Sequence, residues 1–305
     1  MDQNLLFATN SNPDLVAKIC ELAGLHQAKY RLGRFADGEI SLHLDEPIAL
    51  KVAFVLGSFY PPADNLIELL TLINTLHING VAKVVAVIPY PGYGKSDRLD
   101  QPDIPVNARL TIECLEIAGA DQFITLNLHS QLINRYFRVP HQDLSAMPLF
   151  AEKLKTDGLG SLTVVAPDQG GIDRAGDYAK ASGQNDIVVI EKHRPQDDQT
   201  EVVRINGAVE GRDLVLIDDM VQTGLTLITA AAALKKQGAK DIYVAATHFV
   251  YSARALEPIT NDANIKKIYI TNSIPVPTEV TLPEKFAVLP IEPLLAEAIK
   301  PLLTA

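Results

Sequence analysis

The sequence predicts an α/β protein of two tandem domains, each with a mostly parallel sheet flanked by helices. Short apolar runs rich in Val and Ile alternate with amphipathic stretches, which is typical of buried parallel strands and the helices that cover them. The 305 residues correspond to roughly two domains of about 150 residues each. A pattern in the first half of the chain also recurs in the second half.

The strands are expected at the apolar runs, which end in polar or glycine-containing turns. Their ranges are 4–9, 52–57, 83–89, 122–127, 162–167, 187–191, 214–218, 241–247 and 267–271. Helices are expected where apolar residues recur at helical spacing. Their ranges are 13–24, 65–79, 107–119, 146–156, 171–182, 226–238 and 291–303. Strands that alternate with helices favour an open sheet covered on both faces.

The repeated pattern joins a helix end to a strand in each half. The runs NGVAKV at 79–84 and QGAKDI at 237–242 both place a glycine between a predicted helix and a predicted strand. We interpret the halves as two copies of one unit; the alternative is that glycine is simply common at helix C-termini. The expected domains are 1–145 and 146–290, with a C-terminal helix in 291–305 that can pack on the first domain.

Composition and charge exclude several classes of partner. With 37 acidic and 27 basic residues, the net charge of −10 provides no overall positive field for nucleic acid or an anionic membrane. Cys20 and Cys114 are too few for a disulfide framework, which fits a reducing compartment. The N-terminus lacks the pattern of a secretion signal, and no apolar run reaches the roughly 20 residues of a membrane span. We therefore expect a cytoplasmic protein.

An acidic loop stands at the head of a predicted helix. The strand LVLI at 214–217 stops at Asp218 and Asp219, and MVQTGLT at 220–226 leads into the helix. Backbone amides and threonine hydroxyls at a helix N-terminus suit a phosphate, while adjacent carboxylates suit the hydroxyls of a sugar. The alternative is a pair of helix-capping aspartates, but a cap needs only one side chain. The loop therefore predicts a sugar-phosphate site.

This loop resembles the phosphoribosyl-diphosphate (PRPP) loop of type I phosphoribosyltransferases and ribose-phosphate diphosphokinases. Five further stretches resemble the diphosphokinases alone. They are RFADGEI at 34–40, PYPGYGKSDR at 89–98, LHS at 128–130 with YF at 136–137, APDQGGIDRA at 166–175 and EKHRP at 191–195. The resemblance implies two type I phosphoribosyltransferase-like domains. It also implies transfer of the β,γ-diphosphoryl group of ATP to ribose 5-phosphate, giving AMP and PRPP, with Mg²⁺ as cofactor.

The resemblance also implies roles for individual residues. Lys192 and Arg194 match catalytic cations of a loop that closes on the phosphates, and stabilisation by cations suits phosphoryl transfer. His129 matches a catalytic, Mg²⁺-ligating histidine, and Asp168 matches a second metal-associated position. The residues that would bind ribose 5-phosphate are Asp218, Asp219, Gln222, Thr223, Gly224, Leu225 and Thr226.

The ATP site is implied by two stretches. The residues that match it are Phe35, Asp37, Glu39, Lys95, Ser96, Asp97 and Arg98. An aromatic face with carboxylates suits adenine, whose exocyclic amine donates hydrogen bonds. In the family, the residues of the first stretch reach a neighbouring subunit's site, which implies a homo-oligomer, specifically a hexamer built from dimers. Phe35 to Glu39 can also be read as a plain turn.

Several positions depart from the family pattern. Lys95 and Ser96 stand where Arg-Gln is usual, so a bidentate phosphate contact would become a point charge. The other departures are Asn127 and Gln222 in place of Asp, Arg138 and Gln142 in place of frequent acidic residues, and Leu225 in place of Gly. We expect less negative charge around His129. We also expect the Leu225 side chain to crowd the phosphate or to oppose a left-handed backbone.

Three functions are compatible with these features. An active diphosphokinase would use the retained Lys192, Arg194, His129 and acidic pair. A catalytically weak homologue that regulates an active synthetase would account for the departures. A type I phosphoribosyltransferase would use the PRPP loop but leaves Phe35, Lys192 and Arg194 without a role. Formation of AMP and PRPP from ATP and ribose 5-phosphate separates the first function from the other two.

Overall fold

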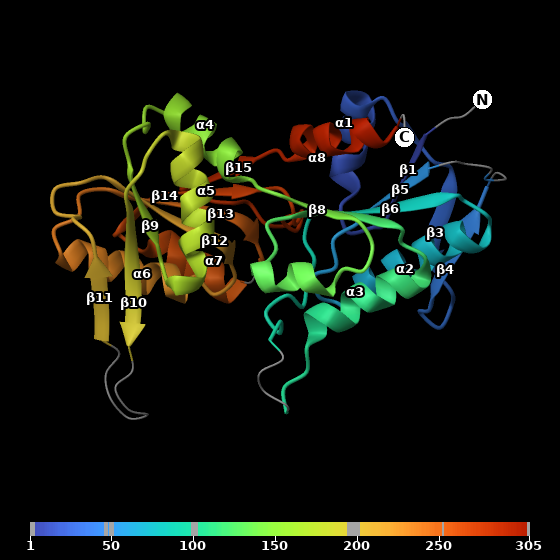
Figure 1. The fold of residues 1–305 in the computed structure, drawn as a ribbon, viewed down its shortest axis with the longest axis horizontal. Helices are drawn as coiled ribbons and strands as arrows, with labels where there is room; N and C mark the ends of the chain where they lie inside the picture. The colour runs from blue at the N-terminus through green and yellow to red at the C-terminus, as the bar shows by residue number, and fades with distance from the viewer. Residues whose placement is uncertain are drawn as a thin grey trace. The chain divides into compact units, whose positions relative to one another are not determined.

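The chain divides into two compact units in the computed structural model, which describes residues 4–45, 48, 52–98, 103–193, 202–251 and 253–303 (Figure 1). Unit 1 contains Met1–Leu144, Ser273–Pro275 and Pro290–Ala305. Unit 2 contains Ser145–Asn272 and Val276–Leu289. The short segment Ser273–Pro275 thus belongs to unit 1, although it lies within the range expected for the second domain.

Unit 1 is built on a six-stranded sheet in the order β2-β1-β5-β6-β7-β8, in which every pair is parallel. The strands are β1 (Leu5–Ala8), β2 (His26–Gln27), β5 (Val52–Leu56), β6 (Lys83–Ile88), β7 (Gln122–Leu126) and β8 (His141–Leu144). The helices are α1 (Pro13–Ala23), α2 (Asp64–Ile78), α3 (Asn107–Ala118), α8 (Glu292–Ile299) and the 3₁₀ turns η1 (Gln131–Tyr136) and η3 (Lys300–Leu302). A separate antiparallel hairpin joins β3 (Tyr30–Arg34) to β4 (Ile40–Leu44).

Unit 2 is built on a seven-stranded sheet in the order β11-β10-β9-β12-β13-β14-β15. The strands are β9 (Thr163–Ala166), β10 (Ile187–His193), β11 (Val202–Asn206), β12 (Leu214–Val221), β13 (Ile242–Phe249), β14 (Ile265–Thr271) and β15 (Phe286–Leu289). The helices are α4 (Met147–Thr156), α5 (Ile172–Ser182), α6 (Leu225–Lys236), α7 (Ala253–Asn261) and the 3₁₀ turn η2 (Gln169–Gly171). All pairs are parallel except β10 with β11.

The two units repeat one topology, as the sequence pattern predicts. The order β2-β1-β5-β6-β7-β8 of unit 1 corresponds strand for strand to β10-β9-β12-β13-β14-β15 of unit 2. Helix α8 follows the last strand of unit 2 but packs on α1 within unit 1. Helix α4 follows the last strand of unit 1 but packs on α5 within unit 2. The predicted α/β class with parallel sheets is therefore confirmed.

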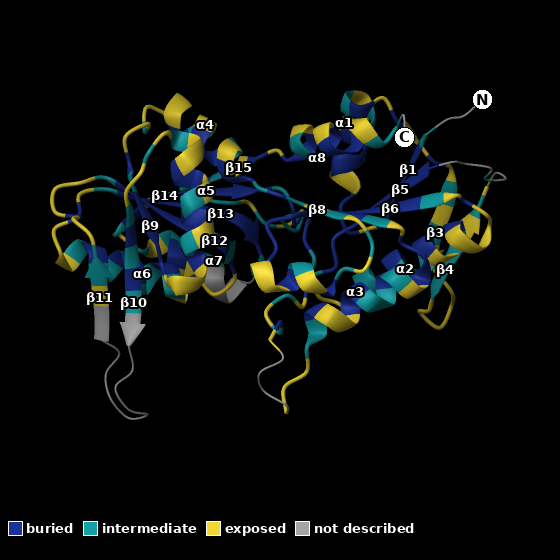
Figure 2. Cartoon of the chain, in the orientation of Figure 1, coloured by how far each residue is buried: buried dark blue, intermediate teal, exposed yellow. Residues whose placement is uncertain are grey.

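Buried apolar strands account for the core of each unit. Figure 2 shows the central strands largely in the buried colour, and the five residues of β5 are all buried. Helices cover the sheets because their apolar stripes face inward, as with Leu69, Leu72, Ile73 and Leu76 of α2. Within the described ranges, no helix combines the length and the apolar character that a membrane span requires.

Several elements were not predicted, because their own residues carry weak signals. Strand β8 has the sequence HQDL, which contains one apolar residue, and it forms by pairing with β7. The hairpin β3–β4 is largely exposed or half-buried, so it lacks a continuous apolar run. Helix α7 contains Pro258, which usually interrupts a helix.

Candidate active site

The acidic pair lies within β12, which continues to Val221 because its backbone remains paired with β13. The Asp219 side chain is only 6% exposed, and the Asp218 side chain is 16% exposed. Arg174, from α5, is equally buried, and its guanidinium nitrogens lie 3.8 Å from an oxygen of each carboxylate. The backbone N–H of Asp219 also donates to Asp218 Oδ1 at 2.8 Å. The two aspartates therefore share one buried counter-ion.

Sequence reasoning did not single out Arg174. A signal was present, since a pair of carboxylates at a buried strand end requires a cation nearby. The run APDQGGIDRA contains one basic residue, Arg174, and its helix follows the strand that neighbours β12. Only the fold shows that this arginine points at the pair.

The buried negative charge of the acidic pair is only partly balanced. Burial raises the pKa of Asp218 well above its ordinary value, and the negative charge of Asp219 raises it further, while Arg174 acts in the opposite direction. Arg174 thus offsets the raised pKa of Asp218 only in part. Such a site favours a further cation or a hydroxyl donor, as the predicted sugar site requires.

The loop after β12 places a helix N-terminus beside the acidic pair. Gly224 has φ +72° and precedes the first residue of α6, while Thr223 Oγ1 accepts the backbone N–H of Leu225 at 3.4 Å. Gln222, Thr223 and Leu225 are exposed. Residues 218–226 therefore form one continuous segment that runs into the N-terminus of α6. The polar groups of this segment lie at the helix N-terminus, an arrangement that suits a phosphate.

The expectation that Leu225 opposes a left-handed backbone is wrong. Among the described residues that carry a side chain, positive φ occurs only at Tyr93 and Asn127. The left-handed position of this loop is Gly224, while Leu225 begins α6. The Leu225 side chain is 65% exposed.

Replacing Gly224 by alanine is expected to weaken the binding of ribose 5-phosphate about tenfold. A Cβ at this position would lie 3.2 Å from Cβ of the buried Ile259, and a side chain in the left-handed region costs about 1–2 kcal/mol. The loop would relieve this strain by moving. Isothermal titration calorimetry with ribose 5-phosphate measures the loss.

Gly183→Ala is the matched control, because Gly183 has φ +74° at the C-terminus of α5 and a Cβ there would meet nothing within 4 Å. Both variants place a side chain in the left-handed region, but only Gly224→Ala adds the contact with Ile259. Equal affinities in the two variants would contradict the assignment of this loop.

Asp168 lies at the same edge of the unit 2 sheet. It follows β9, which pairs with β12, and its Oδ1 accepts the backbone N–H of Gly171 at 3.0 Å, capping η2. The side chain is exposed. Asp168 therefore caps a turn at the carboxyl edge of the sheet while remaining accessible to solvent.

The first of the predicted cations lies in the neighbouring strand. Lys192 is part of β10, one residue beyond the expected strand end, and pairs with Val203 of β11. Glu191 accepts hydrogen bonds from Gln169 Nε2 at 3.2 Å and Asn206 Nδ2 at 2.7 Å, which tie the end of β10 to its neighbours. The Lys192 side chain and the whole of Arg194 lie outside the described residues.

In unit 1, the structure brings His129 and the second predicted ATP stretch together. His129 comes shortly after β7 and is half-buried. Its neighbour Ser130 donates from Oγ to the Asp97 carboxylate, and a Cβ at Gly94 would lie 3.3 Å from that of His129. These two segments of the chain, distant in sequence, therefore form one surface.

Within this stretch the side chains differ in orientation. Lys95 and Arg98 are exposed, whereas Asp97 is only 6% exposed. The Ser96 hydroxyl donates to the backbone carbonyl of Pro105. Among residues 95–98, Lys95 and Arg98 are thus the ones whose side chains are presented to solvent.

The first predicted ATP stretch forms the turn between β3 and β4. Asp37 Oδ1 accepts the backbone N–H of Glu39 at 3.1 Å, and the N–H of Phe35 donates to the carbonyl of Glu39 at 2.8 Å. Arg34 anchors the turn through an ion pair of 2.8 Å with Asp64 of α2. The turn presents Phe35, 60% exposed, together with the exposed carboxylates of Asp37 and Glu39.

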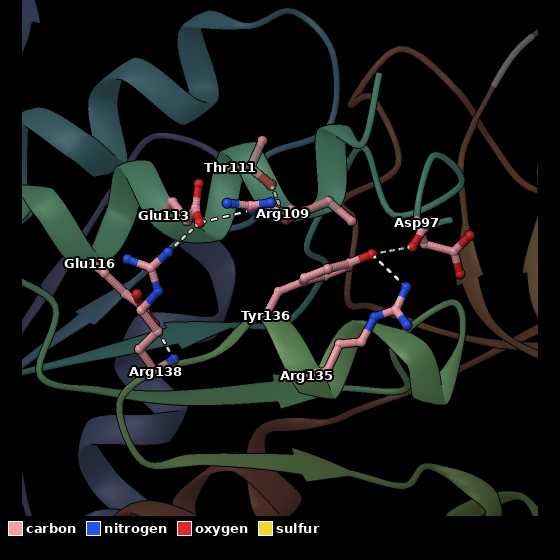
Figure 3. A network of polar contacts seen from close by, with 9 residues as sticks. Asp97, Arg109, Thr111, Glu113, Glu116, Arg135, Tyr136 and Arg138 are labelled. Carbon is pink, nitrogen blue, oxygen red and sulfur yellow. Dashed lines mark hydrogen bonds and ion pairs between the residues drawn. The ribbon is translucent and has the colours of Figure 1, made fainter. Parts of the chain in front are cut away.

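Arg138 belongs to a separate charge network on α3. Its Nη2 donates to Glu113 Oε1 at 2.6 Å, its backbone N–H donates to Glu116 Oε1 at 2.7 Å, and Arg109 Nε also donates to Glu113, at 2.9 Å (Figure 3). Acidic partners on α3 therefore balance the positive charge of Arg138.

Two carboxylates contact the chain neighbours of His129: Asp97, which the resemblance assigned to ATP, and Asp143, which sequence reasoning did not single out. Asp97 contacts Ser130, and Asp143, at the end of β8, accepts the backbone N–H of Leu128. Asp143 therefore supplies a carboxylate next to the His129 turn that the expected loss of negative charge did not take into account. Across the described ranges, no three His, Cys, Asp or Glu side chains form a group able to hold a metal.

Comparison with known proteins shows which family has this architecture. A family model described as the N-terminal domain of ribose phosphate pyrophosphokinase matches residues 4–119, and a model of the phosphoribosyl synthetase-associated domain matches residues 174–304. The ribose-phosphate pyrophosphokinase of Bacillus caldolyticus is 39% identical over 298 residues, covering 96% of this chain and 93% of that protein. That of Thermosipho africanus is 38% identical over 297 residues, covering 96% and 92%.

A solved structure agrees with the sequence matches. The phosphoribosylpyrophosphate synthetase of Mycobacterium smegmatis superposes with a TM-score of 0.90 at 30% identity, covering 99% of each chain. The relatives match over nearly their full length, and the fold agrees throughout. The chain therefore belongs to the ribose-phosphate pyrophosphokinase family.

Proposed function

We propose that this chain is a ribose-phosphate diphosphokinase, which transfers the β,γ-diphosphoryl group of ATP to the anomeric hydroxyl of ribose 5-phosphate and releases AMP and PRPP. The main observation in support is that the acidic pair Asp218–Asp219 is followed directly by the loop at the N-terminus of α6. Carboxylates suit the ribose hydroxyls and the helix N-terminus suits the 5-phosphate. Unit 2 is accordingly the ribose 5-phosphate side.

Unit 1 is assigned to ATP. The turn with Phe35 offers an exposed aromatic face for adenine, and Asp37 and Glu39 can accept from its amine. Lys95 and Arg98 provide exposed cations for phosphate oxygens. Lys192, in β10, and Arg194, two residues later in the sequence, neutralise the charge that spreads over the transferred group in a loose transition state.

The residues present fit a role for Mg²⁺. This ion usually binds one or two carboxylates together with substrate phosphates, so it needs no preformed cage of side chains. Asp168 offers an exposed carboxylate at the sheet edge, and His129 offers an imidazole beside the ATP stretch. Bound at either of these residues, Mg²⁺ would neutralise phosphate charge and help to align the reacting groups.

A homo-oligomer is part of the proposal. Helices α2 and α3 pack together and expose the large apolar side chains Ile67, Ile78, Leu110 and Ile117. Exposed apolar groups of this size favour contact with another protein surface, and the occupant we propose is a second copy of the chain. Light scattering should give a multiple of the 33.1 kDa chain mass, with a hexamer built from dimers as the expected form. The two free cysteines fit a cytoplasmic location.

The decisive experiment mixes purified protein with ATP, Mg²⁺ and ribose 5-phosphate and measures AMP and PRPP separately, with and without inorganic phosphate. Equal amounts of both products are expected. ADP in place of AMP would indicate a simple kinase. Neither product from a folded protein that binds ATP would favour a catalytically weak regulatory homologue. Consumption of PRPP with a nucleobase would instead identify a phosphoribosyltransferase.

A further inference from the structure

His129 lies in the turn that follows the carboxyl end of β7, three residues after the strand ends at Leu126. Asn127, the first residue of this turn, has φ +44°, a conformation that asparagine tolerates better than most residues. Its backbone N–H donates to the carbonyl of Leu144, at the end of β8, at 2.8 Å. The direction in which His129 leaves the sheet therefore depends on contacts with the neighbouring strand end.

The residue before His129 is held by Asp143. The backbone N–H of Leu128 lies 3.2 Å and 3.1 Å from the two carboxylate oxygens of Asp143, and Thr125 Oγ1 donates to Oδ1 at 2.8 Å. Hydrogen bonds to a carboxylate are stronger than neutral ones. Asp143 thus connects Thr125, near the end of β7, to Leu128, the residue that precedes the histidine.

The residue after His129 is held by Asp97. Ser130 donates from Oγ to the Asp97 carboxylate and accepts the N–H of Leu132 at 3.1 Å, so the same hydroxyl begins η1. Tyr136, at the end of η1, donates to the carbonyl of Asp97 at 2.5 Å and accepts from Arg135 Nη2 at 3.0 Å (Figure 3). The Asp97 residue is buried, and its carboxylate accepts the hydrogen bond from Ser130.

We propose that Asp143 and Asp97 are positioning residues, which hold the backbone on either side of His129 and so fix the direction of its imidazole. The two carboxylates come from different segments, and each contacts a direct chain neighbour of the histidine. This inference rests on the proposed function, in which His129 acts at the ATP site. It assigns Asp97 to the support of that site, whereas the sequence comparison assigned it to ATP itself.

Asp143→Ala is expected to lower kcat about 10- to 100-fold, with little change in KM for ATP, the usual loss when support of a functional ligand is removed. Asp143→Asn should recover most of kcat, because its amide oxygen can still accept from Leu128 and Thr125. Ser130→Ala, which removes the donor to Asp97, should lower kcat in the same way. Asp121→Ala is the matched control, since Asp121 accepts the backbone N–H of Val84 at 2.8 Å at the opposite end of β7.

Double variants that also carry His129→Ala separate a positioning role of Asp143 and Ser130 from other roles. In His129→Ala protein, the additional change Asp143→Ala or Ser130→Ala should have no further effect on the residual rate. An undiminished effect in this background, or an Asp143→Asn variant as slow as Asp143→Ala, would overturn the proposal. A wild-type enzyme without turnover would instead contradict the proposed function. A His129→Ala variant with full activity would leave that function in place and overturn the positioning proposal.

A readout independent of activity completes the test. Diethyl pyrocarbonate modifies accessible histidines, and mass spectrometry of the peptides reports the rate at each one. The rate at His129 should change at least about threefold in Asp143→Ala, because a released turn alters exposure of the ring, and should stay unchanged in Asp143→Asn. The exposed His26 serves as the internal reference. An unchanged His129 rate in Asp143→Ala would contradict the proposal.

Discussion

Replacing Lys192 by alanine is expected to lower kcat for AMP formation by about 10³-fold or more, while the fold remains intact. A single cation that stabilises the charge of a phosphoryl-transfer transition state contributes a factor of about 10³–10⁵. The backbone of Lys192 is held in β10, opposite Val203, so the substitution leaves the strand pairing in place. Because the interaction strengthens in the transition state, kcat should fall much more than the affinity for either substrate.

Quenched assays of AMP, combined with calorimetric measurement of ATP and ribose 5-phosphate binding, separate the two effects. Lys180→Ala is the matched control, because Lys180 is an exposed lysine on α5 of the same unit. It should leave both parameters unchanged. A Lys192→Ala variant with normal kcat would refute the assignment, and one that loses only substrate affinity would limit this lysine to binding.

Asp218→Asn is expected to have opposite effects on function and stability. Ribose 5-phosphate binding should weaken about 10- to 100-fold, because a charge-assisted hydrogen bond to a sugar hydroxyl contributes about 1.5–3 kcal/mol. At neutral pH the folded protein should gain about 1 kcal/mol, which corresponds to roughly 2–4 °C in Tm. The gain arises because asparagine is neither charged nor repelled by Asp219, while Arg174 keeps Asp219 as a partner.

The pH dependence of stability follows from the raised pKa of Asp218. Between the ordinary value near 3.8 and the raised value, the folded protein binds more protons than the unfolded chain, so wild-type stability falls as pH increases through this interval. The variant lacks this contribution. Its advantage should therefore be absent below pH 3.8 and should grow with increasing pH.

Urea unfolding of both proteins from pH 3.5 to pH 8 tests this expectation. Asp173→Asn, which removes a carboxylate from an exposed position on α5, provides the control for the change in net charge. Equal stability of wild type and Asp218→Asn at neutral pH would mean that Arg174 compensates the pair fully.

Much of the fold and one half of the site were predictable from local sequence. Strand β5 is entirely apolar, and β6 is apolar after Lys83 and rich in Val and Ile, which favours a buried sheet. The acidic pair and the loop to α6 were predictable for a different reason. Their chemical groups are neighbours in the chain, so a strand end and a helix start are enough to bring them together.

The supporting residues were decided only by the tertiary structure. Arg174 reaches the acidic pair because β9, and the helix that follows it, lie beside β12. Asp143 and Asp97 meet the neighbours of His129 across 15 and 33 residues of sequence. Strand β8 is itself polar and forms only against β7. Spacing along the chain therefore determined which groups could bind substrate, whereas the order of strands in the sheets determined which side chains hold those groups in place, because such contacts exist only after the strands have paired.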